Sequence, residues 1–464
     1  MKRILLLNPN TYDNPYPVFP LGLAYIDDAL QQAGHKTEWF DLNLDTLENL
    51  LIRLERGNYD FLAISLRNVD DVRISVKEFF VDRVQHIIQL VRSTCKIAII
   101  LGGSGFSIFP ETIFAYCRPD YGIAGEGEQA FLKVLAGGDL DNIPGLVFER
   151  QGRIHYNTIS RLECTPQQAP VRNSRVLDYY LLDGGMANVQ TQRGCPLKCC
   201  YCTYPLIEGK RYRRRSGESI AQEFLELKKA GTRYVFFVDS VFNTGHQHVV
   251  EICEELINAG SPLPWCCFMR PKHVTSELLQ LMKKAGLRHV EFGSDSLSDS
   301  VLESYGKEFS FAEIRESSLL VKEVGIDFCH YVIFGGPGET KATMQESFEN
   351  SKQISGALYF PSVGMRIYPD TPLQRISIAE THSSAEPESK SDSEKNSLLR
   401  PTFYIAQELT IEWIERKVKY FATQSPNWVD LEHSPEFDTV AKRLRKKGVA
   451  GPLWNYLSAM RRLT

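Results

Sequence analysis

The chain has 464 residues, of which 43% are hydrophobic, and its 57 acidic and 53 basic side chains give a net charge of −4. This length favours about three domains, and the near balance of charge excludes a general electrostatic field for nucleic acid or anionic membranes. No apolar run approaches the ~18 residues that span a bilayer, and Met1 leads into a strand pattern rather than a signal sequence. We therefore expect a cytoplasmic protein with no nucleic-acid or membrane partner.

Short apolar strands and helices alternate over the first 150 residues. Strand patterns fall at 3–8, 37–41, 60–65 and 96–101, and helix patterns at 20–33, 45–56, 76–93 and 129–135. Such alternation predicts a doubly wound, Rossmann-like α/β domain over residues 1–150, with helices on both faces of a parallel sheet. Ligands of these sheets bind at the carboxyl ends of the strands. The candidate ligand-binding loops are therefore residues 8–10, 65–68, 102–106 and 125–128.

A second α/β region at 188–375 follows a proline-punctuated linker at 151–187. Residues 376–400 are rich in Ser, Glu, Lys and Asp, which predicts a flexible, solvated segment. Residues 401–464 predict a mostly helical C-terminal domain in which tryptophans serve as packing anchors. The strand patterns of the second region fall at 188–192, 234–238, 265–269, 289–292, 328–333 and 362–367, each followed or preceded by a helix pattern. Six such units are too few for a closed eight-unit barrel.

Three cysteines at C-x3-C-x2-C spacing, Cys195, Cys199 and Cys202, directly follow Gly194. Four thiolates saturate a [4Fe-4S] cluster, so three leave one iron open to a small molecule. A zinc knuckle and reduced core cysteines are the alternatives. Zinc at a closed site takes a fourth ligand, and this run contains no His.

The cysteine spacing, with the aromatic Tyr201 before the last cysteine, resembles the radical S-adenosylmethionine (SAM) superfamily. The resemblance implies that Cys195, Cys199 and Cys202 ligate the cluster and that Cys200 is a neighbour. It implies a partial (β/α)6 barrel, which the six units match. It also implies that the open iron chelates SAM, whose reductive cleavage gives a 5′-deoxyadenosyl radical.

The same resemblance places SAM at the carboxyl ends of the barrel strands, near Tyr201. The second strand ends in Asp239 and Ser240, which replace the G-G-E motif of many relatives and would contact the SAM amino group. Arg270 could pair with the SAM carboxylate, since a planar guanidinium suits that exchange; an ion pair within the barrel is the alternative. Ser294 and Asp295 could reach the ribose hydroxyls.

Glycine-bearing turns mark the strand ends of the first domain. The pair Gly102-Gly103 follows an apolar strand, and glycines there let a bulky ligand approach the backbone. Together with residues 125–128 and 20–23, this pair resembles the cobalamin-binding domain that precedes the radical SAM barrel in one large subfamily. The cobalamin contacts that this resemblance implies are Asn8, Pro9, Ser65, Arg67, Asn68, Gly102, Gly103, Ser104, Gly125, Glu126 and Gly127.

Many cobalamin proteins carry D-x-H-x-x-G, whose His ligates cobalt from below, but none of the ten His here lies in such a motif. We therefore expect cobalamin without a histidine ligand. Arg67 would lie near the lower face, where a guanidinium has no lone pair to donate. A surface salt bridge is the alternative for Arg67.

These resemblances imply a cobalamin-dependent radical SAM methyltransferase. The enzyme would transfer methyl from methylcobalamin to an unactivated carbon after the 5′-deoxyadenosyl radical abstracts hydrogen. A non-methylating cyclase or ring-rearranging oxidoreductase is the first alternative, and a non-catalytic corrinoid or cluster sensor is the second. The expected partners are a small-molecule substrate and an electron donor such as flavodoxin or ferredoxin. The sequence identifies neither a catalytic residue nor the substrate.

Overall fold

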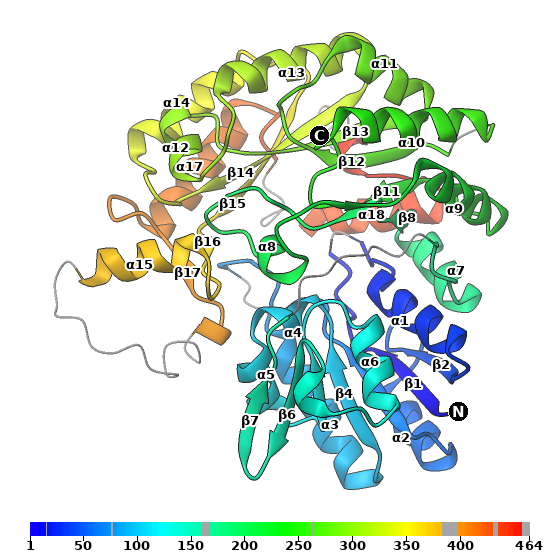
Figure 1. The fold of residues 1–464 in the computed structure, drawn as a ribbon. Helices are drawn as coiled ribbons and strands as arrows, with labels where there is room; N and C mark the ends of the chain where they lie inside the picture. Colours follow the sequence, from blue (N-terminus) through cyan, green and yellow to red (C-terminus); the bar gives the residue numbers. More distant parts are fainter. Residues whose placement is uncertain are drawn as a thin grey trace.

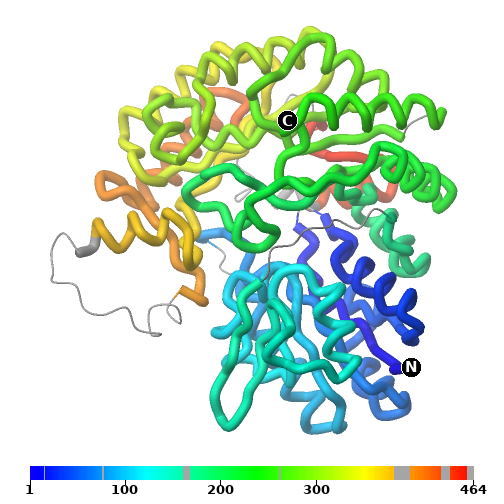
Figure 2. Tube along the Cα trace, viewed as in Figure 1, coloured from blue at the N-terminus to red at the C-terminus, as the bar shows by residue number. Residues whose placement is uncertain are grey.

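The computed structural model describes residues 1–464 except 15, 76–77, 160–167, 261–262, 383–397, 430–434 and 457–464. The predicted flexible segment at 376–400 lies mostly outside the described residues. Two α/β domains stack against each other, with α8 (Tyr204–Ile207) at their junction (Figure 1). Figure 2 shows that the chain from blue to cyan forms one domain and that the green and yellow chain forms the other.

The N-terminal domain contains a seven-stranded sheet in the order β2-β1-β3-β4-β5-β6-β7. Its first five strands are parallel, and β6 and β7 join antiparallel at one edge. The strands are β1 (Arg3–Asn8), β2 (Lys36–Asp41), β3 (Phe61–Ser65), β4 (Ala98–Gly102), β5 (Tyr121–Ile123), β6 (Leu146–Arg150) and β7 (Arg153–Tyr156).

Helices cover both faces of this sheet because its central strands are apolar at successive positions. Leu5 and Leu7 pack with one set of helices, whereas Ile4 and Leu6 pack with the other. The first face carries α2 (Leu47–Arg56), α3 (Phe80–Thr94) and α5 (Pro110–Cys117), and the second carries α1 (Leu21–Gln32) and α6 (Glu128–Leu135). The doubly wound α/β prediction is confirmed.

The sheet continues beyond residue 150. Gln151 and Gly152, with φ of 54° and 75°, form a tight turn between β6 and β7. Positive φ at both central residues is typical of the turns that join two-residue hairpins. The segment predicted as a linker therefore contains a strand of the first sheet, and it also contains α7 (Ser174–Asp183).

Six parallel strands form the second sheet, in the order β15-β14-β13-β12-β11-β8. This arrangement confirms the partial barrel. The strands are β8 (Ala187–Val189), β11 (Val235–Phe237), β12 (Trp265–Met269), β13 (Leu287–Asp295), β14 (Asp327–Phe334) and β15 (Leu358–Val363). The outer helices are α9 (Gly217–Lys229), α10 (His246–Asn258), α11 (Ser276–Lys284), α12 (Asp299–Ser304), α13 (Phe311–Val324) and α14 (Lys341–Ser351).

The prediction for the last strand was wrong by several residues. We expected residues 362–367, but β15 is Leu358–Val363 and contains Pro361. Proline cannot donate to a sheet and is confined to edges. β15 is an edge strand, so this position tolerates it.

The C-terminal region is mostly helical and packs onto the barrel. It comprises α15 (Pro372–His382), α17 (Ile411–Gln424) and α18 (Pro435–Lys446), with β16 (Met365–Arg366) paired to β17 (Phe403–Tyr404). Trp428 and Trp454 are buried as expected, and the Trp454 indole donates to Glu291 Oε1 at 2.9 Å inside the barrel.

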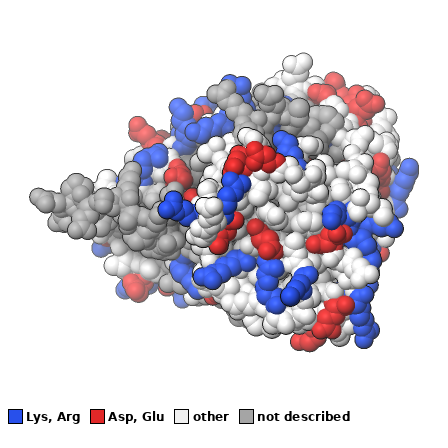
Figure 3. Space-filling view, turned by 60° about the horizontal axis from the view of Figure 1, so that its bottom comes forward, with Lys and Arg blue, Asp and Glu red and all other residues white. Residues whose placement is uncertain are grey.

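Among the described residues, no helix combines the length and the apolar character needed to cross a bilayer. Basic and acidic side chains are interspersed over the face drawn in Figure 3. Both observations agree with the balanced composition.

Candidate active site

The three motif cysteines lie in the loop between β9 (Gln192–Arg193) and α8. The Cys195 amide donates to Gly209 O at 2.9 Å, and the Cys202 amide donates to Cys199 O at 3.2 Å, so the loop folds back on itself. Burial, together with the neighbouring thiols, raises the pKa of Cys202 to about 12. Iron would therefore displace a proton from Cys202 on binding. Among the described residues, no three or more His, Cys, Asp or Glu side chains lie in an arrangement that could hold a single metal ion.

Cys200 faces the protein core. Its Sγ lies 3.8 Å from Met365 Sδ, and its backbone is held by Tyr305 O and by the Leu373 amide at 2.9 and 2.8 Å. A side chain with these contacts points away from the loop that carries the other three thiols. This geometry supports the predicted ligand set of Cys195, Cys199 and Cys202, which stays a prediction.

A buried lysine beside the cysteines was not predicted. Lys307 pairs with Asp295, and its Nζ lies 3.3 Å from the Tyr201 hydroxyl and 3.4 Å from Gly293 O. Burial alone would lower the pKa of Lys307, but the Asp295 carboxylate and the Cys199 thiol hold it above its usual value. Lys307 follows a helix in a sequence without any motif, so only the fold brings it to the site.

The predicted SAM contacts at the strand ends are already hydrogen-bonded within the protein. Asp239 accepts from the Thr191 hydroxyl and amide at 2.5 and 2.7 Å and from the Gln192 amide at 3.1 Å. Burial raises its pKa to about 7. Ser294 bonds to His330 Nδ1 at 2.8 Å. Asp239 therefore holds the connection that leads into the cluster loop, and its predicted contact with SAM remains untested.

Ser240 and Gly293 lie closer to open space. The Ser240 hydroxyl donates to Gly194 O at 3.4 Å, directly before the first cysteine. A Cβ at Gly293 would meet no other atom within 4 Å. The strand end therefore leaves the backbone at Gly293 open to close approach by a ligand.

Arg270 lies at the end of β12 and is mostly buried. Its Nη2 is 3.3 Å from Glu308 Oε2, and its guanidinium lies over the Phe309 ring at 5.8 Å. Asn243 fixes the Arg270 backbone through both its amide and its carbonyl, at 2.9 Å each. Glu308 is half exposed, so its ion pair with Arg270 is weak. The pair can break when another anion binds Arg270.

Arg270→Ala is expected to weaken SAM binding about tenfold to over a hundredfold while leaving the iron content unchanged. The reason is loss of a charge-assisted hydrogen bond worth roughly 1.5–3 kcal/mol. SAM titration of the reconstituted protein, with iron counting, measures both quantities. Glu308→Gln is the matched control, because it removes the alternative partner and keeps Arg270. Unchanged SAM affinity in Arg270→Ala would show that Arg270 serves the ion pair alone.

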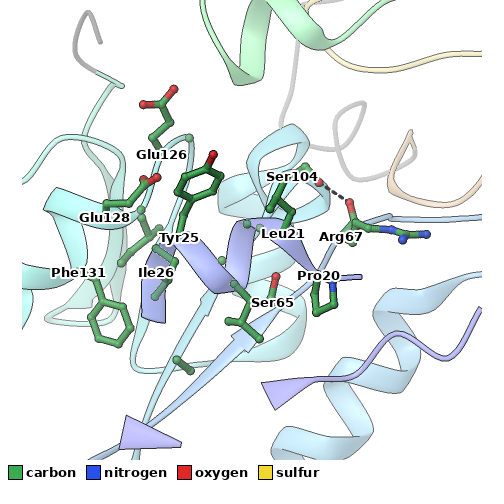
Figure 4. A pocket seen from close by; sticks show the side chains of 18 of the residues that line it. Pro20, Leu21, Tyr25, Ile26, Ser65, Arg67, Ser104, Glu126, Glu128 and Phe131 are labelled. Atoms are coloured by element: carbon green, nitrogen blue, oxygen red, sulfur yellow. Dashed lines mark hydrogen bonds between the residues drawn. The ribbon is translucent and has the colours of Figure 1, made fainter. Parts of the chain in front are cut away.

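A cavity of about 270 Å³ lies at the carboxyl ends of the strands of the N-terminal sheet (Figure 4). Its floor is apolar and includes Ala63, Ile100 and Phe131. A Cβ at Gly22, in the first turn of α1, would meet nothing within 4 Å, so this glycine leaves space for a ligand. Of the predicted cobalamin contacts, the lining includes Asn8, Ser65, Arg67, Gly102, Gly103, Ser104, Gly125, Glu126 and Gly127.

The two other predicted contacts line a neighbouring cavity. Pro9 and Asn68 border a more polar space of about 500 Å³, which shares Ser65 and Arg67 with the first cavity. The predicted cobalamin residues therefore form one surface across two adjoining cavities. A corrinoid, which is much larger than either cavity, suits such a continuous surface.

Arg67 lies where the two cavities meet. Its carbonyl accepts from the Ser104 hydroxyl at 2.6 Å, and its guanidinium points away from Tyr25 and Glu126 (Figure 4). Its Nη1 is buried and has no hydrogen-bond partner among the described residues. Burial lowers the pKa of Arg67. These observations do not support the surface salt bridge that we considered as an alternative.

The barrel domain closes one side of the first cavity, through residues that the sequence did not identify as contacts. Gln190, Arg193, Ile207 and Glu208 contribute to its lining. Glu208 accepts from the Gly194 amide at 2.9 Å, so one carboxylate contacts both the cavity and the start of the cluster loop. Burial raises the pKa of Glu208. The first cavity and the cysteine loop therefore meet at Glu208, between the two domains.

Comparison with known proteins agrees with this division. Residues 189–350 match the radical SAM superfamily model, and residues 13–135 match the B12 binding domain model. The tryptophan 2-C-methyltransferase of Streptomyces laurentii is 25% identical over 439 residues, which cover 79% of this chain and 73% of that protein. The hopanoid C-3 methylase of Methylococcus capsulatus is 25% identical over 66% of this chain and 59% of that protein.

The fold is also similar to solved structures. The radical SAM methyltransferase TsrM from Kitasatospora setae superposes with a TM-score of 0.87 at 23% identity, covering 100% of this chain and 98% of that one. The cobalamin-dependent SAM radical enzyme OxsB gives 0.72 at 16% identity, covering 97% and 72%.

A B12-binding domain joined to a radical SAM barrel defines the class of enzyme. The chain belongs to the cobalamin-dependent radical SAM enzymes, and its named relatives include methyltransferases. The cofactors of that family are a [4Fe-4S] cluster, SAM and cobalamin.

Proposed function

We propose that this enzyme transfers a methyl group to an unactivated carbon of a small-molecule substrate held between its two domains. The observation that carries the proposal is the shared wall: Glu208 lines the corrinoid cavity and also binds the Gly194 amide next to Cys195. A methyl donor and a hydrogen-abstracting centre must face the same substrate, and this wall brings the two sites together.

The cluster and SAM would be held by the barrel strand ends. Cys195, Cys199 and Cys202 would bind iron, and Arg270 would pair with the SAM carboxylate. Lys307 holds the Asp295 carboxylate next to Tyr201, which fixes the position of an acceptor for the SAM ribose hydroxyls. When bound, the cofactors supply hydrogen abstraction and the methyl group, and the protein supplies positioning and exclusion of water.

The corrinoid would lie across the strand ends of the N-terminal sheet. Gly102 and Gly103 would line its site, although a Cβ at Gly103 would first meet the Leu66 backbone. The apolar cavity above Ala63 and Ile100 would receive an apolar part of the corrinoid. Arg67 would face the metal from below, where its positive charge would disfavour a lower ligand. An electron donor such as flavodoxin or ferredoxin would supply reducing equivalents.

Tryptophan is the first substrate to test, because the named relatives include a tryptophan 2-C-methyltransferase. The reconstituted enzyme would be incubated anaerobically with cobalamin, reductant, candidate substrates and SAM carrying a deuterated methyl group. A product with the labelled methyl group supports the proposal. A rearranged product without label would instead favour the cyclase alternative, to which relatives such as the anaerobic magnesium-protoporphyrin IX monomethyl ester cyclase of Cereibacter sphaeroides point. Corrinoid binding without any product across the substrate panel would favour the sensor.

The cob(II)alamin form is expected to show no electron paramagnetic resonance splitting from a protein histidine. No His is among the residues that line either cavity, and Arg67 has no lone pair to offer. Spectra of protein with and without isotopically labelled histidine nitrogen provide the measurement. Free cob(II)alamin, whose own base supplies nitrogen splitting, is the control. Splitting that changes with the histidine label would contradict this prediction.

A further inference from the structure

A buried group of ion pairs joins the corrinoid cavity to the strand that precedes the cluster loop. Arg193 lies between two carboxylates, with Nη1 at 3.1 Å from Glu126 and Nη2 at 3.0 Å from Glu128. Arg213, which is paired with Arg193 across the β9–β10 (Arg213–Arg214) ladder, binds Glu126 as well. We call Glu126, Glu128, Arg193 and Arg213 the interdomain bridge.

One end of the bridge belongs to the corrinoid cavity. Glu126, Glu128 and Arg193 all contribute to its lining, and Glu128 is the first residue of α6. The Arg193 guanidinium also lies over the Tyr25 ring at 4.8 Å, and Tyr25 lines the same cavity. Figure 4 shows Tyr25, Glu126 and Glu128 together on one side of the cavity. A ligand that fills this space therefore contacts the bridge directly.

The other end of the interdomain bridge is connected rigidly to the cysteine loop. Arg193 is two residues before Cys195, and Gly194 between them has φ of 88°. A Cβ at Gly194 would lie 2.0 Å from Arg211 O, so this backbone is packed tightly against the chain that leads into β10. Glu208 holds the Gly194 amide, and Gly209 O holds the Cys195 amide at 2.9 Å. A displacement of Arg193 is therefore transmitted to the first cysteine.

The charges make the bridge sensitive to its surroundings. The Arg193 side chain is 7% exposed, and the Glu126 and Glu128 side chains are 15% and 16% exposed. A buried charge needs its partner, because the attraction within the pair grows when water is removed and must offset the cost of desolvating both charges. Filling the cavity with a corrinoid removes water from the exposed side of both carboxylates.

We propose that the interdomain bridge links the two cofactor sites thermodynamically, with Arg193 as the positioning residue. Corrinoid binding strengthens the bridge and fixes Cys195 in the geometry that the cluster needs. When the cluster has already fixed the cysteine loop, Arg193 and Glu208 are held in place at the cavity, and the corrinoid binds more tightly. Linkage is reciprocal, so either cofactor must raise the affinity for the other by the same factor. This inference rests on the proposed function, because it takes cobalamin and a [4Fe-4S] cluster as the two ligands.

The test measures hydroxocobalamin affinity for the full chain by anaerobic equilibrium dialysis, with and without the reconstituted cluster. Wild-type protein is expected to bind about fivefold or more tightly when the cluster is present, the lower end of typical coupling. In Glu128→Gln the ratio is expected to fall close to one, because the amide keeps the shape and loses the charge. Glu111→Gln is the matched control, since Glu111 is an exposed carboxylate in the first turn of α5 and lines neither cavity.

Two further measurements separate linkage from simple loss of structure. The iron content of Glu128→Gln is expected to equal that of wild type, whereas the resonance of the reduced cluster should shift with cobalamin only in wild type and Glu111→Gln. Arg193→Lys keeps the charge but loses the planar fork, so an intermediate ratio is expected. A ratio in Glu128→Gln equal to that of wild type, or a wild-type ratio of one, would overturn the linkage. Absence of any cobalamin binding in either state would contradict the proposed function instead.

Discussion

Replacing Cys195, Cys199 or Cys202 with Ala is expected to abolish the bound [4Fe-4S] cluster, whereas Cys200→Ala is expected to retain it. Each of the first three changes leaves two protein thiolates, which hold an iron–sulfur cube poorly. The Cys200 thiol contacts Met365 in the core and faces away from the loop. Iron and sulfide counting after anaerobic reconstitution, together with the visible spectrum, measures the outcome.

Cys200→Ala is also the internal control for stability. It removes a buried thiol in contact with Met365 and is expected to cost about 1 kcal/mol, since the cavity left behind is small. Thermal unfolding of the cluster-free proteins should therefore rank Cys200→Ala below Cys199→Ala and Cys202→Ala, whose side chains are only partly buried. A cluster lost in Cys200→Ala but kept in Cys199→Ala would refute the ligand assignment.

Gly22→Leu is expected to remove cobalamin binding while leaving the cluster and SAM sites intact. A side chain at Gly22 would enter the open space of the corrinoid cavity, where a Cβ meets nothing within 4 Å. Leu is a better helix former than Gly, so α1 should not be weakened. We expect a loss of at least about 100-fold in hydroxocobalamin affinity, equivalent to ~2.7 kcal/mol. Equilibrium dialysis measures this loss.

Gly293→Val supplies the reciprocal case. Gly293 faces open space beside Lys307 and Asp295, and Val suits a strand. This variant should lose SAM binding and keep cobalamin. Loss of both cofactors in either variant would indicate general disruption, and normal cobalamin affinity in Gly22→Leu would show that the corrinoid does not use this cavity.

The sequence predicted those parts of the structure that depend on local pattern. Parallel strands are continuous apolar runs, and this signal placed β1 to β4 of the first sheet, five of the six barrel strands and the loops at their ends. The short strand β5 was missed. The cysteine spacing and the glycine pair Gly102-Gly103 are equally local. These local signals marked the cysteine loop and the loops of the corrinoid cavity, which meet at Glu208.

The predictions failed where the position of a segment or side chain in the folded protein determines its structure or its partners. The strand β15 was misplaced because Pro361 is unfavourable inside a sheet but acceptable on an edge strand, and edge position is not written in the local sequence. The β6–β7 hairpin was missed although Gln151-Gly152 carried a turn signal. Lys307 and Arg193 could not be identified, since their partners Asp295, Glu126 and Glu128 are brought to them only by the folded chain.

The hydrogen bond between Trp454 and Glu291 affects the order in which the protein can mature during synthesis. Glu291 lies on β13, in the middle of the barrel sheet, and Trp454 comes 163 residues later. Until that tryptophan leaves the ribosome, a carboxyl group in the barrel interior lacks one of its donors, and the interior remains accessible to water. Among the described residues, the N-terminal core that packs α1 and α6 contains none after Phe148, so this part can fold while the barrel is still being translated. The core on the other face of the sheet also includes Leu399 and is completed later. The nascent chain would then present the N-terminal part of the corrinoid-binding surface before it has a barrel able to complete that surface and protect an oxygen-sensitive cluster.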